Sequence, residues 1–401
     1  MSKNKDFIEI FLVPGFLGFE FLGDLDYFLD VEQVLERRLA EKKLEAVVHA
    51  LGTKVPAGSV RLRAAYLVKE AAAMHSEKAK SVHFVGHSTG GLDIRMMLSP
   101  GGAIDSRRDF TNDPTSDEGV FLTPAERQNL PDLLEKIRSA TSVATPHRGT
   151  PIANFAMRFA ADRILRRSHD CLESPLPEFL LKEGLALASC VTKPTKPFLC
   201  ETSFLNWIVG TVLSAEPDKV VQYFQQAGED VGALRNLTQE GMDMGDALLL
   251  DRKGVRYGSI ITGTNKPTDM IATGDFLMWW TTLFFRAARF LVSRKNEDYD
   301  YITEKNRKKM LKFYCRDRID NPDVGELEIN DQTSDGIVPT LSQPYGEVLG
   351  VFASDHLDCV GHFPHYRENG DPVSGWVRSG AGFNGKRHEL LWTRVADFVA
   401  R

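Results

Sequence analysis

Short apolar blocks alternate with blocks of helical periodicity along the first part of this chain. Residues 7–13, 46–50 and 82–85 are short, mostly apolar runs of the kind found in strands. Residues 31–43 and 59–74 instead repeat apolar side chains at helical spacing, which predicts two helices. Because strands that alternate with helices form parallel sheets, the pattern predicts an α/β fold with a doubly wound, mostly parallel sheet.

The pattern returns further along the chain after longer interruptions. Residues 139–144, 256–262 and 347–352 are additional strand candidates. Residues 389–400 have the spacing of an amphipathic helix that closes the chain. The later strands are therefore expected to extend the same sheet.

Three stretches do not fit this alternation, and they define the predicted domains. Residues 101–138 are polar with Gly, Asp and Pro, 151–250 are rich in helix formers, and 263–330 join an apolar helix to a charged segment. The rest of the chain is long enough for one compact core. We therefore predict a core of residues 1–150 and 251–401 with an insertion at 263–330, and a largely helical cap or lid at 151–250.

Composition narrows the class of protein. The 401 residues are 42% apolar and 26% charged, as in a globular chain and unlike a disordered, fibrous or membrane-embedded one. A net charge of −6 gives no indication of a nucleic-acid partner. The five cysteines contain no CxxC pair and indicate no disulfide framework. No signal-peptide pattern precedes the first strand, so we expect a cytoplasmic protein, or a secreted one if a leader was removed.

The most informative motif is Gly86-His87-Ser88-Thr89-Gly90, which follows the apolar run 82–85 and precedes a helical pattern. In a G-x-S-x-G turn between strand and helix, the small residues leave room for a strained backbone that exposes the serine hydroxyl. The motif predicts Ser88 as a nucleophile and the Thr89 amide as an oxyanion donor. His87 is expected only to pack beside the turn.

A second oxyanion donor is expected from the loop after an early strand. Phe16 lies there, with Gly15 on one side and Gly18 close by on the other. An ordinary turn at the end of a strand would have the same composition. Together with the serine motif, this position makes the Phe16 amide the candidate.

A serine nucleophile needs a histidine base and a carboxylate that orients it, in the order Ser, Asp or Glu, His. His356 follows the strand candidate 347–352 after a short loop, where a catalytic residue at a strand end is expected. His362 and His365 are the alternatives. For the acid, Asp335 is favoured because it lies one strand ahead of the histidine and is followed by apolar residues. An Asp-Gly turn would give the same signal, and Asp331 and Asp320 are the alternative acids.

Six motifs occur in the order in which the bacterial true lipases carry them, and on these the chain resembles that family, the family I triacylglycerol lipases of the α/β-hydrolase superfamily. The motifs are PGFLGF (14–19), GSVR (58–61), GHSTGGLDIR (86–95), SATSVATPHRGT (139–150), SDGIVP (334–339) and DHLDCV (355–360). The resemblance covers the core and not the cap.

The resemblance implies an α/β-hydrolase fold and ester hydrolysis with Ser88, Asp335 and His356 as the triad and Phe16 and Thr89 as oxyanion donors. Three features depart from the family. Pro14 stands where the family usually has a histidine, no secretion signal is recognised, and residues 151–250 and 263–330 match no part of the family pattern.

The resemblance also implies a structural calcium at Asp358, two residues after the base. His362 occupies the position of a further ligand, and imidazole is a poor ligand for a hard cation that prefers oxygen. A zinc site at His362 and His365 would lack the additional ligands that zinc requires. No cofactor is therefore expected to be required, and calcium remains an option.

An apolar segment at residues 276–292 contains Trp279 and Trp280 and is interrupted by Thr and Arg. It is too short and too polar to span a bilayer, which takes about 20 apolar residues. A cap helix packed on the core is the simpler interpretation. The alternative is that the two tryptophans line an acyl-chain site or contact a lipid surface.

These features together predict a lipase or esterase that acts on acyl esters through an acyl-enzyme intermediate. An acyltransferase, a polyester depolymerase or a phospholipase would use the same triad. A non-catalytic binding module on the same scaffold is disfavoured because candidates for all three triad residues are present.

Overall fold

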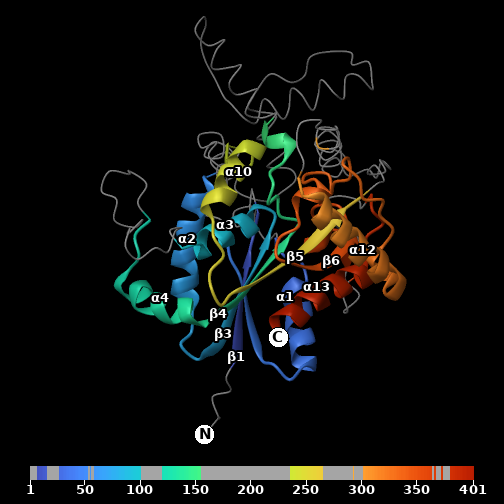
Figure 1. Ribbon diagram of the computed structural model, residues 1–401. Helices are drawn as coiled ribbons and strands as arrows, with labels where there is room; N and C mark the ends of the chain where they lie inside the picture. The colour runs from blue at the N-terminus through green and yellow to red at the C-terminus, as the bar shows by residue number, and fades with distance from the viewer. Residues whose placement is uncertain are drawn as a thin grey trace, which may run out of the picture.

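The computed structural model describes residues 7–15, 27–52, 55, 58–100, 120–154, 235–264, 292, 301–363, 365–366, 372–373 and 380–401, and every structural statement below concerns these residues. Within them, six strands form one parallel sheet (Figure 1). The strands are β1 (Phe7–Val13), β2 (Ala46–Ala50), β3 (Ala79–His87), β4 (Ile137–Val143), β5 (Arg256–Gly263) and β6 (Glu347–Ala353). Their order is β2-β1-β3-β4-β5-β6, so the carboxyl ends of all six strands share one edge.

Helices cover both faces of this sheet (Figure 1). On one face α2 (Val60–Met74) contacts both α3 (Thr89–Leu98) and α4 (Pro124–Lys136). On the other face α1 (Val31–Glu41) contacts α13 (Gly385–Val399), and α12 (Glu304–Asp320) lies beside β6. The sheet therefore forms the middle of three layers.

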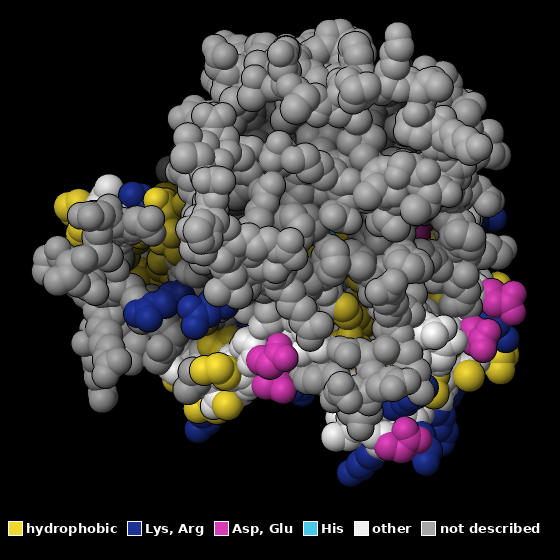
Figure 2. Space-filling view, turned by 90° about the horizontal axis from the view of Figure 1, so that it is seen from above, with side chains coloured by type: hydrophobic (Ala, Val, Ile, Leu, Met, Phe, Trp, Pro, Cys, Tyr) yellow, Lys and Arg dark blue, Asp and Glu magenta, His cyan; other side chains and the backbone are white. Residues whose placement is uncertain are grey.

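Several shorter elements complete the described part of the chain. They are helix α10 (Gln239–Leu248), the 3-10 turns η2 (Pro322–Val324), η3 (Thr340–Ser342) and η4 (Asp358–Val360), and an antiparallel pair of strands, β7 (His365–Tyr366) and β8 (Pro372–Val373). In the view onto the carboxyl-end edge, acidic and basic side chains of described residues lie interspersed around the rim (Figure 2).

A polar side chain satisfies one of the first amides of helices α2, α4, α10, α12 and α13. Ser59 accepts a hydrogen bond from the Leu62 amide at the start of α2. Thr123 and Glu126 form a reciprocal capping box at the start of α4, a device that satisfies two amides at once. Asn384 caps α13 in the same way as Ser59 caps α2.

Two apolar clusters hold the layers together. One packs α1 and α13 on the sheet and includes Leu35 and the fully buried Trp392. The other packs α2, α3 and α4 on the opposite face and includes Phe84 and Ile94. Burial of apolar surface is the main favourable contribution to folding, so these clusters stabilise the frame on which the loops at the strand ends are mounted.

The structure confirms the predicted parallel sheet and the α/β-hydrolase fold, and it changes some boundaries. Strand β3 starts at Ala79 rather than at residue 82, because Ala79 and Ser81 pair with Phe7 and Ile8 of β1. Most of the predicted cap at residues 151–250 lies outside the described residues, so the division into core and cap stays a prediction.

Candidate active site

Ser88 lies at the turn between β3 and α3, with backbone angles that few residues adopt. Its φ is 54° and its ψ is −129°. The two glycines of the motif are required by space: a Cβ on Gly86 would overlap the backbone of Gly90 and Gly91, and one on Gly90 would overlap the Val13 carbonyl. The local sequence therefore allows the strained turn that directs Ser88 to the carboxyl-end edge of the sheet.

The structure brings the three predicted triad side chains together. His356 Nε2 lies 3.0 Å from Ser88 Oγ, and His356 Nδ1 lies 2.8 Å from Asp335 Oδ2. All three residues are buried, and Asp335 is fully so. The Asp335 carboxylate accepts a hydrogen bond from the Nδ1–H group of His356. A neutral His356 therefore carries its proton on Nδ1, and its Nε2 can accept the serine proton.

The Asp335 carboxylate is held from both sides by hydrogen-bond donors. Its Oδ1 accepts from the amides of Ile337 and Val338 at 3.0 and 2.8 Å. Its Oδ2 accepts from Thr262 Oγ1 at 2.8 Å in addition to His356. The two amides can only donate, so they hold the carboxyl group as an acceptor and fix its orientation toward the histidine.

The turn that carries Asp335 explains how a residue far from β5 in the sequence reaches the end of that strand. Thr264, directly after β5, pairs with Ser334 in an isolated antiparallel bridge. Gly336 then adopts a φ of 100°, which a residue with a side chain rarely does, and the chain folds back at Val338. Asp335 thus sits in an Asp-Gly turn and also faces the base, so the two interpretations of this motif are compatible.

One of the two predicted oxyanion donors lies in the described part of the chain. Thr89 is the first residue of α3, and an amide at the start of a helix has no partner within the helix. Phe16 lies outside the described residues. The residue before it, Gly15, lies directly against Ser88, since a Cβ on Gly15 would come 2.6 Å from the Ser88 Cβ.

His87 is placed differently from expectation. It does not only pack beside the turn: its Nε2 lies 2.9 Å from the backbone oxygen of His356, and its Nδ1 lies 2.6 Å from Tyr27 Oη. Burial, and secondarily the nearby His356, hold the pKa of His87 well below its usual value. The sequence contains no signal for these contacts, because Tyr27 and His356 are distant along the chain.

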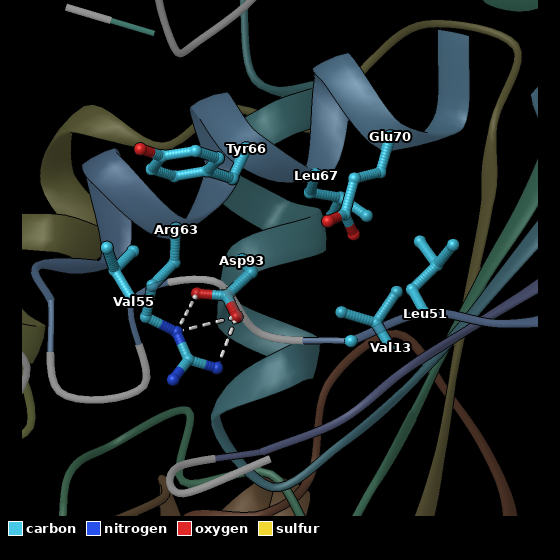
Figure 3. Close-up of a pocket in the computed structure, with 9 residues that line it drawn as sticks. Val13, Leu51, Val55, Arg63, Tyr66, Leu67, Glu70 and Asp93 are labelled. Atoms are coloured by element: carbon cyan, nitrogen blue, oxygen red, sulfur yellow. Dashed lines mark hydrogen bonds and ion pairs between the residues drawn. The ribbon is translucent and has the colours of Figure 1, made fainter. Parts of the chain in front are cut away.

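A buried ion pair supports the same corner of the site. Arg63 of α2 and Asp93 of α3 face each other (Figure 3), with a shortest distance of 2.7 Å between Nη2 and Oδ2. Arg63 also donates to the Pro14 carbonyl at 3.3 Å. The cavity beside this pair measures about 20 Å³, which suffices for one water molecule and not for an acyl chain.

The side chains considered for metal binding have other partners. His365 Nε2 lies 2.9 Å from Asp30 Oδ2, and His362 Nε2 lies 3.0 Å from the Tyr27 carbonyl. Asp358 accepts a hydrogen bond from the Asp355 amide at 3.1 Å. Among the described residues no group of three or more His, Cys, Asp or Glu side chains is arranged to hold a metal. Calcium binding at Asp358 stays a prediction.

Two further expectations concern the apolar segment and membranes. Trp279 and Trp280 lie outside the described residues, so their assignment to an acyl-chain site stays a prediction. Within the ranges that the structure describes, the helices are too short or too polar to cross a bilayer.

Comparisons with known proteins give similarity to esterases and lipases at low identity. No model of a known protein family and no curated protein sequence matches the chain. Among solved structures, a metagenomic carboxyl esterase aligns with 98% of this chain and 75% of its own, at 16% identity and a TM-score of 0.47. The alignment with lipase 1 from Pelosinus fermentans covers 99% of this chain and 99% of the lipase, at 16% identity and a TM-score of 0.47. EstA from Clostridium botulinum covers 98% of this chain and 87% of its own, at 16% identity and a TM-score of 0.48.

Proposed function

We propose that the protein is a serine hydrolase of carboxylic esters, of the lipase or esterase kind. Ser88 is the nucleophile, His356 the general base and Asp335 the carboxylate that orients it. The observation that supports this most is the unbroken hydrogen-bonded series from Asp335 through His356 to Ser88, at 2.8 and 3.0 Å. It lies at the carboxyl ends of the parallel strands, where α/β folds bind their ligands.

The first half of the reaction forms an acyl-enzyme. Ser88 Oγ attacks the ester carbonyl carbon while His356 Nε2 accepts the hydroxyl proton. The carbonyl oxygen becomes an oxyanion that the amides of Thr89 and Phe16 stabilise. His356 then gives the proton to the leaving alkoxide oxygen, the carbon–oxygen bond breaks, and the acyl group stays on Ser88.

The second half of the reaction returns the enzyme to its starting state. A water molecule gives a proton to His356 Nε2 as its oxygen attacks the acyl carbon, and a second oxyanion forms at the same donors. Its collapse breaks the bond to Ser88 Oγ, which takes the proton back from His356. The buried Asp335 stabilises the imidazolium in both halves, because its hydrogen bonds already orient its oxygens toward Nδ1.

The substrate class is proposed from the sequence motifs. The resemblance to bacterial true lipases suggests acyl-chain esters, and Trp279 and Trp280 are the proposed apolar contacts for the chain or for a lipid surface. Transfer of the acyl group to an alcohol would use the same triad, and only the acceptor at deacylation would differ. No described feature favours transfer over hydrolysis.

Replacement of the nucleophile tests the proposal. We expect a folded Ser88→Ala variant to lose turnover of p-nitrophenyl esters of graded chain length and to lose labelling by a fluorophosphonate probe. The matched control is Ser81→Ala, at the other end of β3, where the hydroxyl contacts His83 at 3.0 Å. Wild-type ester turnover by folded Ser88→Ala protein would contradict the assignment.

A further inference from the structure

A series of hydrogen bonds joins Gly15, which lies after β1 and next to the proposed oxyanion donor Phe16, to the loop that carries His356. The Gly15 amide donates to Tyr27 Oη at 3.0 Å, and Tyr27 Oη lies 2.6 Å from His87 Nδ1. His87 Nε2 lies 2.9 Å from the His356 carbonyl. The series therefore runs from the residue before Phe16, around the nucleophile, to the backbone of the proposed base.

The direction of each hydrogen bond is determined by its ends. The Gly15 amide can only donate and the His356 carbonyl can only accept. His87 Nε2 must therefore carry a proton, and Nδ1 of a neutral ring accepts the proton of the Tyr27 hydroxyl. Burial lowers the pKa of His87 and raises that of Tyr27, so both groups stay in these neutral forms at physiological pH.

The segment that carries Tyr27 is attached to the loop of the base. The Leu29 amide donates to the Val360 carbonyl at 2.9 Å, and His362 Nε2 lies 3.0 Å from the Tyr27 carbonyl. Gly361 has a φ of 99° and lies so close to Leu29 that a Cβ there would overlap the Leu29 carbonyl. A displacement of Tyr27 would therefore be transmitted to the loop of His356.

We propose that Tyr27 and His87 are positioning residues. They hold Gly15, next to the Phe16 amide, and the loop of His356 at the correct separation from Ser88. The proposal rests on the proposed function and deepens it. Neither side chain needs to touch the substrate, because each acts through a backbone group: Gly15 before the Phe16 amide, and the His356 carbonyl. Displacements of about 1 Å from residues outside the chemistry can cost on the order of 10²-fold in rate.

Removal of one hydroxyl tests the positioning role. Tyr27→Phe leaves the buried Gly15 amide without its acceptor and His87 Nδ1 without its donor, so we expect kcat to fall by about 10- to 100-fold with little change in KM. The matched control is Tyr257→Phe at the start of β5, where the hydroxyl also accepts a backbone hydrogen bond, from Arg252 at 3.0 Å. That variant should keep the wild-type kcat.

The Nδ1 nitrogen of His87 gives a readout that loss of packing would not reproduce. Nitrogen-15 chemical shifts should report the Nε2–H tautomer in both the wild type and Tyr27→Phe, because the His356 carbonyl still accepts from Nε2. The Nδ1 resonance alone should move in Tyr27→Phe, because Nδ1 no longer accepts the tyrosine proton. His87→Gln and His87→Leu provide a second comparison, because only the Gln amide can still donate to the His356 carbonyl. Gln should retain more kcat than Leu at equal thermal stability.

A double-mutant cycle tests whether the two residues act as one unit. If they do, Tyr27→Phe combined with His87→Leu should lose little more kcat than His87→Leu alone. Losses that multiply, or a folded Tyr27→Phe variant with wild-type kcat, would overturn the positioning role and leave the proposed hydrolase intact. A wild-type protein that neither hydrolyses esters nor reacts with a fluorophosphonate would overturn the proposed function, and the positioning role with it.

Discussion

At the scale of single residues, directed hydrogen bonds leave one arrangement of protons around the proposed nucleophile. Asp335 is surrounded by donors, which keeps it an acceptor toward His356. His87 lies between a hydroxyl and a carbonyl, which keeps it neutral. Groups that cannot change partners need no reorganisation during a reaction, and this is the condition for electrostatic stabilisation of a transition state.

The Asp335→Asn substitution removes the charge of the proposed acid and keeps the shape of its side chain, so it tests the charge alone. In Asp335→Asn an amide replaces the carboxylate, His356 is no longer held with its proton on Nδ1, and we expect kcat to fall by about 10⁴-fold in a folded protein. Asp331→Asn is the control, because Asp331 is exposed and pairs with Arg307 at 2.8 Å. Steady-state kinetics would assign the acid to another residue if the Asp331 variant lost activity and the Asp335 variant did not.

At the scale of elements, a buried charge cluster joins the sheet to two helices at the end opposite the site. Glu9 of β1 accepts from the Ser76 amide at 2.9 Å, and His75, just after α2, lies 2.6 Å from Glu9 and 2.8 Å from Asp132 of α4. Burial raises the pKa of Glu9, but the hydrogen bonds, from His49 and His75 first, together lower it below 4.5. Burial lowers the pKa of His75, but its two carboxylates raise it above 6.5.

These shifts predict a pH window for stability. The contribution of Glu9 is present above its unfolded-state pKa and is lost as pH falls through the lowered value, whereas that of His75 is present below its unfolded-state pKa and is lost as pH rises through the raised value. The difference in free energy of unfolding between the wild type and Glu9→Gln/His75→Gln should therefore be largest between pH 4.5 and 6.5. Urea denaturation across the pH range measures it.

The control for this experiment is an exposed ion pair. Glu347 and Arg401 lie 2.7 Å apart at the surface, where charge pairs contribute little because water screens them. Glu347→Gln should therefore give a difference from the wild type that stays small and nearly flat with pH. A flat profile for the Glu9 and His75 variant as well would show that the cluster is not ionised as described.

At the scale of the whole molecule, the last helix, α13, packs against the core and against the loop that carries His356. The ring of Trp392 in α13 is fully buried, and its Nε1 donates to the Cys359 carbonyl at 3.0 Å, three residues after His356. The end of α13 is also held to the start of β5, where Arg256 donates to the Phe398 carbonyl at 2.8 Å. Residues of α13 thus contact both the loop after β6 and the first residue of β5.

Truncation of this tryptophan should destabilise the entire domain. Trp392→Ala removes a fully buried ring and leaves a cavity, so we expect a loss of about 3–5 kcal/mol in free energy of unfolding. Ile319→Ala is the comparison, since Ile319 is 82% exposed and should change stability by no more than about 0.5 kcal/mol. Equal midpoints for both variants in denaturant titrations would show that α13 is not part of the cooperative core.

The features that the sequence predicted are those that a short window of residues determines. The apolar run 7–13 forms the buried strand β1, because burial of such a run does not depend on which strand lies beside it. The turn at Ser88 was predicted because its glycines are required by the backbone of the turn itself. The strand start at Ala79 was missed because its pairing partner, Phe7, lies on another strand.

The rest was decided by contacts between residues far apart in the chain. The sequence left Asp335, Asp331 and Asp320 as possible acids, and the structure puts Asp335 beside His356 through a bridge formed after β5. Tyr27 and the ion pair of Arg63 and Asp93 had no sequence signal, because hydrogen bonds and ion pairs require only proximity in space and no regular spacing along the chain. The chain alone therefore determined the sheet and its serine turn, whereas tertiary packing selected the groups that surround that turn.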